Sequence, residues 1–574
     1  MENKKCYIVY LGAHSHGPSP TSLDLQIATH SHYNLLASIL ASEEKAKEAI
    51  IYSYNRHING FAALLEEEEA ADIAKNPKVV SVFLSKKHQL HTTRSWEFLG
   101  LHRNGKNSAW QKGRFGENII IANIDTDIFR LCSYRKSAVE MILRVRLVSL
   151  LRCAVTRLYF YLFDDVASLG RCGVPMSMFH ETIRVADKSC LDRPHGGRQM
   201  SLPEICCRDD PLSKIDPASC YGADVLAAID QAIDDGVDII SLSAGGSYVV
   251  TPEGIFTDEV SIGAFHAIAR NILLVASAGN DGPDLGTVVN VAPWVFTIAA
   301  STIDREFSST LTIGNNNQQI EPDVTAPGVS ILSAYSPFAT ASNLPTDTRR
   351  RFQFNVLQGT SMSCPHVSGI AGLLKTRHPN WSPAAIKSAI MTTANTLDNT
   401  NRPIKDAFDK TLATPFAYGS GHVQPDLAID PGLVYDIGLT DYLNFLCASG
   451  YNQQLISGLN FNRTFTCSGS HKVTDLNYPS ITLPNLGSKA VTITRTVTNV
   501  GPPSTYTATA QVVGYNITVV PNSLSFKKID EKKTFQVIVQ ANSVTKRGSY
   551  QFGELRWTNG KYIVKSPITI RRKY

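Results

Sequence analysis

The sequence predicts a three-part chain: a parallel α/β sheet at its centre, an α+β unit before it and an all-β unit after it. Strands alternate with helices between about residues 217 and 300, a pattern typical of a parallel sheet covered on both faces. A different order of strands and helices occupies residues 6–91. From Asp475 to Tyr574 only short alternating strands separated by Gly, Pro and Asn turns remain, which predicts an all-β sandwich.

Composition and charge are those of an ordinary globular protein. Of the 574 residues, 43% are hydrophobic and 18% are charged, and the length allows two to four domains. The net charge of +5 is too small to indicate a nucleic-acid partner. Residues 130–216 hold 14 Lys/Arg against 10 Asp/Glu, so the remainder is nearly neutral. Four arginines interrupt the longest apolar stretch, residues 139–163, so no membrane partner is expected.

Residues 6–91 predict a compact unit of their own. Strands are expected over 7–11, 49–54, 60–64 and 79–84, and helices over 31–47 and 66–75. This β-α-β-β-α-β order is the ferredoxin-like pattern.

The central part contains two strand–helix units and a preceding strand. Residues 118–124 form a buried-strand pattern that ends in Asp125. Helices are expected over 224–234 and 260–270, and strands over 237–242 and 272–277. Catalytic groups of such a sheet gather at the carboxyl ends of its strands. In the C-terminal part, strands are expected over 491–497, 506–513, 534–539 and 562–568.

A serine at the start of a helix is the most informative feature of the chain. In the run Gly359–Gly369, two small residues precede Ser361, and apolar residues at helical spacing follow it. Unpaired N–H groups and positive potential at a helix N-terminus suit a nucleophile that must stabilise developing negative charge. Taken alone, Ser361 could equally be an ordinary N-cap serine.

The whole run resembles the serine motif of the subtilisin-like proteases (subtilases). The resemblance implies a subtilisin-like parallel-sheet domain that acts as a serine endopeptidase on protein or peptide substrates, without cofactor or metal. It assigns the nucleophile to Ser361, the histidine-orienting carboxylate to Asp125 and the oxyanion-hole amide to Asn280. The backbone around Ser241, Leu242, Ser243, Gly245 and Gly246 is expected to line the substrate cleft, where an extended peptide pairs as an added strand.

Both ends of the chain resemble parts of the plant-type members of this family. Residues 6–91 resemble the inhibitory propeptide, which acts as an intramolecular inhibitor, and the junction is expected at His91 and Thr92. The C-terminal part resembles a fibronectin-like domain. The predicted domains are therefore residues 6–91 (propeptide), 92–129 and 217–472 (catalytic domain), 130–216 (unassigned) and 473–574 (fibronectin type III-like).

The general-base histidine is missing from this pattern. The family motif Gly-His-Gly-Thr-His does not occur, and only His180, His195 and His266 lie between Asp125 and Ser361. His266 falls in a helix interior, and His366 is expected to be a packed core residue. Asp127 also stands where the family has a glycine.

Two further stretches depart from the family. Residues 130–216 show no resemblance, and one hypothesis is that they translate non-native sequence. The protease-associated insert of plant subtilases is absent near residues 313–321.

The departures leave two alternatives to an active enzyme: a catalytically silent peptide-binding homologue, and a structural protein that works through its sandwich domain. A monomer is expected.

Secretion to the extracellular space or cell wall is implied by the resemblance. The sequons at Asn462 and Asn516 would then be glycosylated. The chain opens Met1-Glu2-Asn3-Lys4-Lys5 without an apolar run, so no secretory signal is visible.

Overall fold

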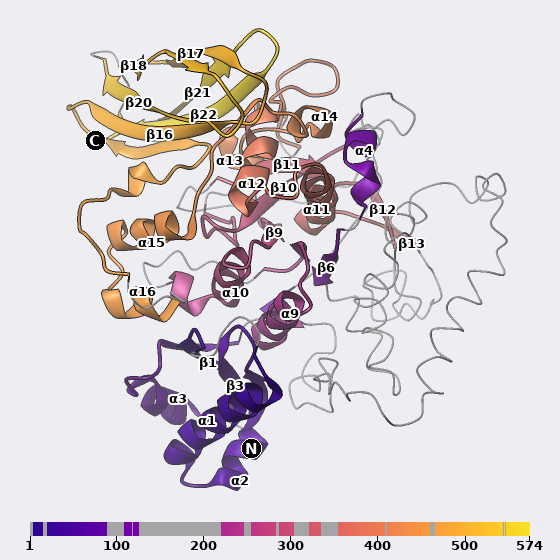
Figure 1. Ribbon diagram of the computed structural model, residues 1–574, viewed down its shortest axis with the longest axis vertical. Helices are drawn as coiled ribbons and strands as arrows, with labels where there is room; N and C mark the ends of the chain where they lie inside the picture. Colours follow the sequence, from indigo (N-terminus) through magenta and orange to yellow (C-terminus); the bar gives the residue numbers. More distant parts are fainter. Residues whose placement is uncertain are drawn as a thin grey trace, which may run out of the picture.

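The computed structural model describes most of the chain outside the segment that the sequence left unassigned (Figure 1). The described residues are 4–14, 20–85, 87–88, 108–117, 119–124, 220–245, 254–282, 286–303, 321–334, 354–407, 410–459, 465–542, 545 and 547–573. Asp125, Gly246, His91 and Thr92 lie outside them, as do His180, His195 and all of residues 130–216. Within the described residues, no helix combines the length and apolar character needed to cross a bilayer.

The N-terminal unit has the predicted ferredoxin-like order. Its strands are β1 (Lys5–Gly12), β2 (Ile50–Tyr54), β3 (Asn59–Leu65) and β4 (Ser81–Leu84), and its helices are α1 (Ser22–Leu40), α2 (Glu43–Ala49) and α3 (Glu67–Ala74). The sheet order is β2-β3-β1-β4, with antiparallel pairs throughout. Val9, Leu36, Phe61 and Ile73 are buried between sheet and helices.

The bounds predicted for the first helix of this unit are wrong. One helix was expected over 31–47, but α1 already starts after Thr21, whose side chain accepts a hydrogen bond from the backbone N–H of Asp24 in a capping box. Ala41 takes a left-handed conformation with φ of 53° and ends α1, and Ser42 caps α2. The first turns of α1 expose Leu23 and Ile27, so they lack the one-sided apolar pattern by which a helix is recognised.

The central sheet is parallel, as predicted. Its strands are β6 (Ile121–Ile124), β8 (Ile239–Leu242), β9 (Leu273–Ser277), β10 (Phe296–Ser301) and β11 (Val324–Pro327), in the order β11-β10-β9-β8-β6. Alternate strand residues serve two cores. Ile240, Leu242 and Leu274 pack with α9 (Gly222–Asp234) and α10 (Glu259–Ile268).

Ile239 and Leu273 pack on the opposite face with α11 (Thr360–Arg377) and α12 (Pro383–Thr393). Smaller elements complete this domain: α4 (Ala109–Lys112), η1 (Arg114–Gly116), β7 (Cys220–Tyr221), η3 (Gly254–Thr257), β12 (Ile331–Ala334), β13 (Phe354–Leu357), α13 (Pro415–Tyr418), α14 (Pro425–Ala428), β14 (Leu433–Val434), α15 (Leu439–Ala448), α16 (Gln453–Leu459) and η4 (Val473–Asp475). A disulfide joins Cys447 of α15 to Cys467.

The C-terminal part is all-β, as predicted. Its strands are β15 (Ile481–Leu486), β16 (Val491–Asn499), β17 (Ser504–Val512), β18 (Tyr515–Val520), β19 (Ser523–Phe526), β20 (Lys532–Ala541), β21 (Tyr550–Thr558) and β22 (Ile563–Arg572). They form one connected sheet that also takes in β14 and curls around a single core (Figure 1). Trp557, Tyr506 and Phe535 fill this core.

A buried ion pair of the central domain holds Tyr478, at the start of the C-terminal domain. Lys387 Nζ lies 2.8 Å from Asp323 Oδ2, with both side chains almost completely buried. The Tyr478 hydroxyl, in the segment that leads into β15, donates to the same carboxylate. Lys387 Nζ also donates to Val295 O at 2.6 Å and lies 4.5 Å from the centre of the Tyr478 ring. Satisfied charges of this kind fix the relative position of the elements that supply them.

Candidate active site

The first turn of α11 is bonded to the ends of three parallel strands. Gly359 precedes the helix with φ of 142°, a conformation that favours glycine. The bonds run from Thr360 Oγ1 to Gly279 O (3.1 Å), from Ser363 Oγ to Ala326 O (2.8 Å), and from Cys364 Sγ to Leu242 O (3.4 Å) and Val275 O (3.3 Å). Small polar side chains allow this approach, so the helix N-terminus sits at the carboxyl edge of the sheet.

Ser361 is the second residue of α11 and is 2% exposed. Its hydroxyl donates to Ser243 O at 3.2 Å, and the Ser243 hydroxyl donates to Ser361 O at 3.0 Å. The Ser243 hydroxyl replaces a missing helix hydrogen bond. The residue four positions after Ser361 is Pro365, which has no N–H to donate to the Ser361 carbonyl.

Asn280 lies beside the helix N-terminus in a defined orientation. Its Oδ1 accepts from the Thr360 N–H at 2.7 Å and from Thr360 Oγ1 at 3.1 Å. A backbone N–H can only donate, so the atom facing Thr360 must be the amide oxygen. The Nδ2 donors of Asn280 therefore point away from Thr360, and the side chain is exposed. Ser361 and Asn280, predicted from separate motifs, are thus both attached to one helix turn.

Among the described residues, no histidine contacts Ser361. His366 is buried in α11 with Nδ1 2.6 Å from Met362 O, as expected for a core residue, and burial lowers its pKa to about 4. His266 is buried in α10, and burial lowers its pKa to about 3. Burial also lowers the pKa of His422 to about 4, and its Nε2 lies 3.0 Å from Ser301 Oγ. All three are neutral imidazoles near pH 7.

The predicted cleft residues divide into two kinds. Ser241 and Leu242 are buried in β8, whose backbone pairs with β6 on one side and β9 on the other. The Ser243 N–H donates to Ile124 O at 3.1 Å. The backbone groups of Ser241 and Leu242, and the N–H of Ser243, are therefore already bonded within the sheet and are not free to pair with an added strand.

The N-terminal unit docks on the helices next to this edge, an interface that the sequence did not predict residue by residue. Asp230 of α9 is buried and accepts the backbone N–H groups of His57 and Ile58, both at 3.0 Å. Arg56 forms an ion pair with Asp234. Burial raises the pKa of Asp230. Burial also acts to raise that of Asp234, but the His57 hydrogen bond and the positive charge of Arg56 outweigh it and lower the value.

Further contacts extend this interface. The Tyr10 hydroxyl lies 2.7 Å from His266 Nε2, a hydrogen bond that joins β1 to the buried imidazole of α10. The Tyr52 hydroxyl donates to Asp224 Oδ1 at 2.7 Å. Beyond β4, residues 87–88 (β5) pair antiparallel with β7, immediately before α9. The chain that leaves the N-terminal unit thus adds a strand to the central domain. In the sequence, only the acidic, amphipathic pattern of α9 indicates that this helix binds the N-terminal unit.

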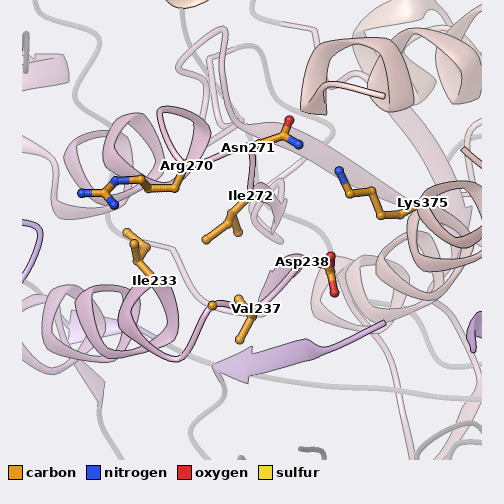
Figure 2. Close-up of a pocket in the computed structure, with 8 residues that line it drawn as sticks. Ile233, Val237, Asp238, Arg270, Asn271, Ile272 and Lys375 are labelled. Atoms are coloured by element: carbon orange, nitrogen blue, oxygen red, sulfur yellow. The ribbon is translucent and has the colours of Figure 1, made fainter. Parts of the chain in front are cut away.

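A cavity of about 350 Å³ lies at the opposite end of the sheet (Figure 2). It opens beside Asp238 and Asn271, which precede β8 and β9, and so lies at the amino ends of the strands. Burial raises the pKa of Asp238 and lowers that of Lys375. The Arg270 guanidinium points away from both (Figure 2). This cavity is separate from Ser361.

Three family models match the chain. The subtilase family model matches residues 212–421, the peptidase inhibitor I9 model residues 6–91, and a fibronectin type-III model residues 475–570. The subtilase match begins just before the end of the unassigned segment and does not include Asp125.

Curated plant proteins match along the whole chain. The subtilisin-like protease Glyma18g48580 of Glycine max is 52% identical, with 100% of this chain and 97% of the relative covered. The subtilisin-like protease SBT5.3 of Arabidopsis thaliana is 36% identical, covering 99% and 96%. The soybean alignment spans 777 positions, more than the 574 residues here, so the relative has segments without a counterpart in this chain.

These matches agree with the parallel sheet, the docked N-terminal unit and the C-terminal β domain. The chain belongs to the subtilase family of subtilisin-like serine proteases, with an I9-type inhibitor domain before the protease domain and a fibronectin type III-like domain after it.

Proposed function

We propose that this chain is a serine endopeptidase whose nucleophile is Ser361 and whose oxyanion-hole amide is Asn280. The observation that carries the proposal is their joint attachment to the first turn of α11. Ser361 lies within that turn. Thr360 donates two hydrogen bonds to the Asn280 amide oxygen, so the Nδ2 donors of Asn280 point away from Thr360. A helix N-terminus and an amide donor are groups that stabilise an oxyanion.

The reaction follows the serine-protease sequence. Ser361 Oγ bonds to the scissile carbonyl carbon, and its proton passes to a general base while the carbonyl oxygen becomes an oxyanion held by Asn280. Collapse of this intermediate releases the amine, which takes up the proton. Water then hydrolyses the acyl-enzyme and regenerates Ser361. Asp125 is proposed to orient the general base. The histidine motif that supplies this base in the family does not occur in the chain.

A catalytically silent peptide-binding homologue is the second candidate. It is favoured by one observation, that no histidine of the described residues contacts Ser361. In subtilisin, removal of the catalytic histidine lowers turnover by about 10⁶-fold. The N-terminal unit would then stay docked on α9 and α10, and the cleft would hold peptides without cutting them.

Export from the cell is part of the proposal. The Cys447–Cys467 disulfide supports it, because such bonds persist in oxidising compartments. Asn516, in the described part of β18, would then carry a glycan.

Self-cleavage distinguishes the two candidates. The full chain and its Ser361→Ala variant are expressed in parallel, and their N-termini are determined. An active enzyme gives a new N-terminus near Thr92 only with Ser361 present, and a fluorophosphonate labels Ser361. Full-length, unlabelled product from the unmodified chain refutes the enzyme and supports the silent homologue.

A further inference from the structure

The near neutrality of the chain outside residues 130–216 conceals a strong charge asymmetry. Residues 475–574 contain 14 Lys/Arg and 4 Asp/Glu, a net charge of +10. The other residues outside 130–216 contain 27 Lys/Arg and 36 Asp/Glu, a net charge of −9. The positive charge is therefore concentrated on the C-terminal β domain, whose surface has a different electrostatic character from the protease domain.

Five of these cations meet at one end of the curled sheet, here named the basic edge: Lys489, Arg547, Arg571, Arg572 and Lys573. Lys489 lies in the turn between β15 and β16. Arg547 forms a β-bridge with Arg572, and the Lys573 N–H donates to Leu486 O at 2.9 Å. The C-terminus marks this end, at the outer left of the domain in Figure 1.

The side-chain carboxylates of the domain lie elsewhere. Asp530 and Glu531 precede β20, a strand of 10 residues, so they lie about 30 Å from its other end at the basic edge. Asp475 belongs to η4 and Glu554 pairs with Arg556. In the part of the chain that the structure describes, no ion pair involves any residue of the basic edge. Among the described residues, no side-chain carboxylate therefore pairs with these cations.

Two arginines of the basic edge are already held in place. Arg571 donates from Nε to Pro484 O at 2.8 Å and lies 4.9 Å from the centre of the Tyr550 ring. Arg572 donates from Nη1 to Thr545 O at 3.1 Å. A guanidinium has five N–H donors in a rigid fork, so both arginines keep donors for a ligand. Their fixed position lowers the entropy lost on binding.

We propose that the basic edge binds a linear polysaccharide that carries carboxylate groups. Arginine forks match carboxylates in a bidentate geometry, and a row of cations at strand ends suits a repeating polyanion. Single-stranded nucleic acid is disfavoured, because its binding uses free aromatic faces. Of the described aromatic residues near this edge, Tyr550 contacts both Arg571 and Phe416, and Tyr515 is buried. This inference is independent of the chemistry at Ser361.

The test measures retention of the full chain on immobilised polygalacturonate at low salt. The edge variant reverses three exposed charges, Lys489→Glu, Arg547→Glu and Lys573→Glu. The matched control reverses three exposed lysines elsewhere in the same domain, Lys527→Glu, Lys528→Glu and Lys561→Glu. Both variants change the net charge equally and leave the bonded arginines intact. Circular dichroism confirms that both are folded.

We expect the edge variant to bind at least tenfold more weakly and the control to stay within twofold of the unmodified chain. Affinity should also fall as salt rises, because binding a polyanion releases counterions. Failure of the unmodified chain to bind, or equal losses in both variants, overturns the proposal. So does tighter, edge-dependent binding to double-stranded DNA, polyglutamate or a sulfated polysaccharide than to polygalacturonate.

Discussion

Ser243 and Ser361 hold each other through two reciprocal hydrogen bonds, each hydroxyl donating to the other residue's carbonyl at 3.0 and 3.2 Å. The pair joins the end of β8 to the first turn of α11. It also supplies the partner that Pro365 cannot give to the Ser361 carbonyl. The proposed nucleophile is thus positioned by a serine of the segment expected to line the cleft.

Substitution Ser243→Ala leaves the buried Ser361 carbonyl without a donor. An unsatisfied buried carbonyl costs about 1–3 kcal/mol, and we expect the free energy of unfolding of the protease domain to fall by that amount. Hydrogen exchange of the α11 amides measures it. The control is Ser368→Ala, whose hydroxyl bonds to Cys364 O at 3.0 Å within an intact helix. A loss in Ser368→Ala as large as in Ser243→Ala would contradict this account.

Substitutions at Asn280 separate its donor role from its anchoring role. Asn280→Asp keeps an oxygen facing Thr360 but loses the Nδ2 donors, whereas Asn280→Ala loses both. Loss of an oxyanion-hole donor lowers turnover by about 10²–10³ in subtilisin. We expect the rate of fluorophosphonate labelling of Ser361 to fall comparably in both variants.

Thr360→Val tests the anchor itself. It removes the Oγ1 bond to Asn280, together with the Oγ1 bonds to the Gly279 backbone, but keeps the backbone N–H bond to Asn280. We expect a loss of only about tenfold, since one of the two bonds to the Asn280 side chain remains. For the Asn280 variants, an unchanged rate of Ser361 labelling in Asn280→Asp would exclude the Asn280 amide from the oxyanion hole.

Sequence patterns predicted the architecture well where the residue pattern of a segment matches the place that the segment takes in the fold. Apolar strands such as 272–277 and the glycine-rich start of α11 identified the parallel sheet and the helix that carries Ser361. The reciprocal Ser243–Ser361 bonds were not predictable, because they depend on which strand ends meet the helix. Asp230 could not be identified either, since its partners are backbone N–H groups 172 and 173 residues away in the sequence.

The docked N-terminal unit depends on the buried carboxylate of Asp230. Removal of this side chain leaves the backbone N–H groups of His57 and Ile58 unsatisfied, and bonds to charged acceptors contribute about 1.5–3 kcal/mol each. We expect Asp230→Ala to increase hydrogen exchange of β1 and β4 amides in the full chain. The control is Asp235→Ala. Asp235 is exposed, follows the last residue of α9 and accepts a hydrogen bond from Gln231 Nε2. Equal exchange in the two variants would show that Asp230 does not hold the interface.

Acidification should weaken the protease domain through its buried histidines. Burial lowers the pKa of His422, and that of His366, to about 4 from an ordinary value of about 6.5. Between about pH 6.5 and 4, each imidazole therefore stays neutral in the folded state but binds a proton in the unfolded state. The resulting stability is fully present above pH 6.5 and is lost as the pH falls toward 4. Each histidine accounts for about 1 kcal/mol between pH 6.5 and 5.5.

The His422→Gln variant tests this dependence, because glutamine keeps polar atoms near Ser301 but does not titrate. Its hydrogen exchange in β10 and β11 should change less between pH 7.5 and 5.5 than that of the unmodified chain, after correction for intrinsic exchange rates. A control variant, His471→Gln, replaces an exposed histidine and should retain the full pH dependence. If His422→Gln and His471→Gln follow the same profile, the buried imidazole of His422 is not a source of acid sensitivity.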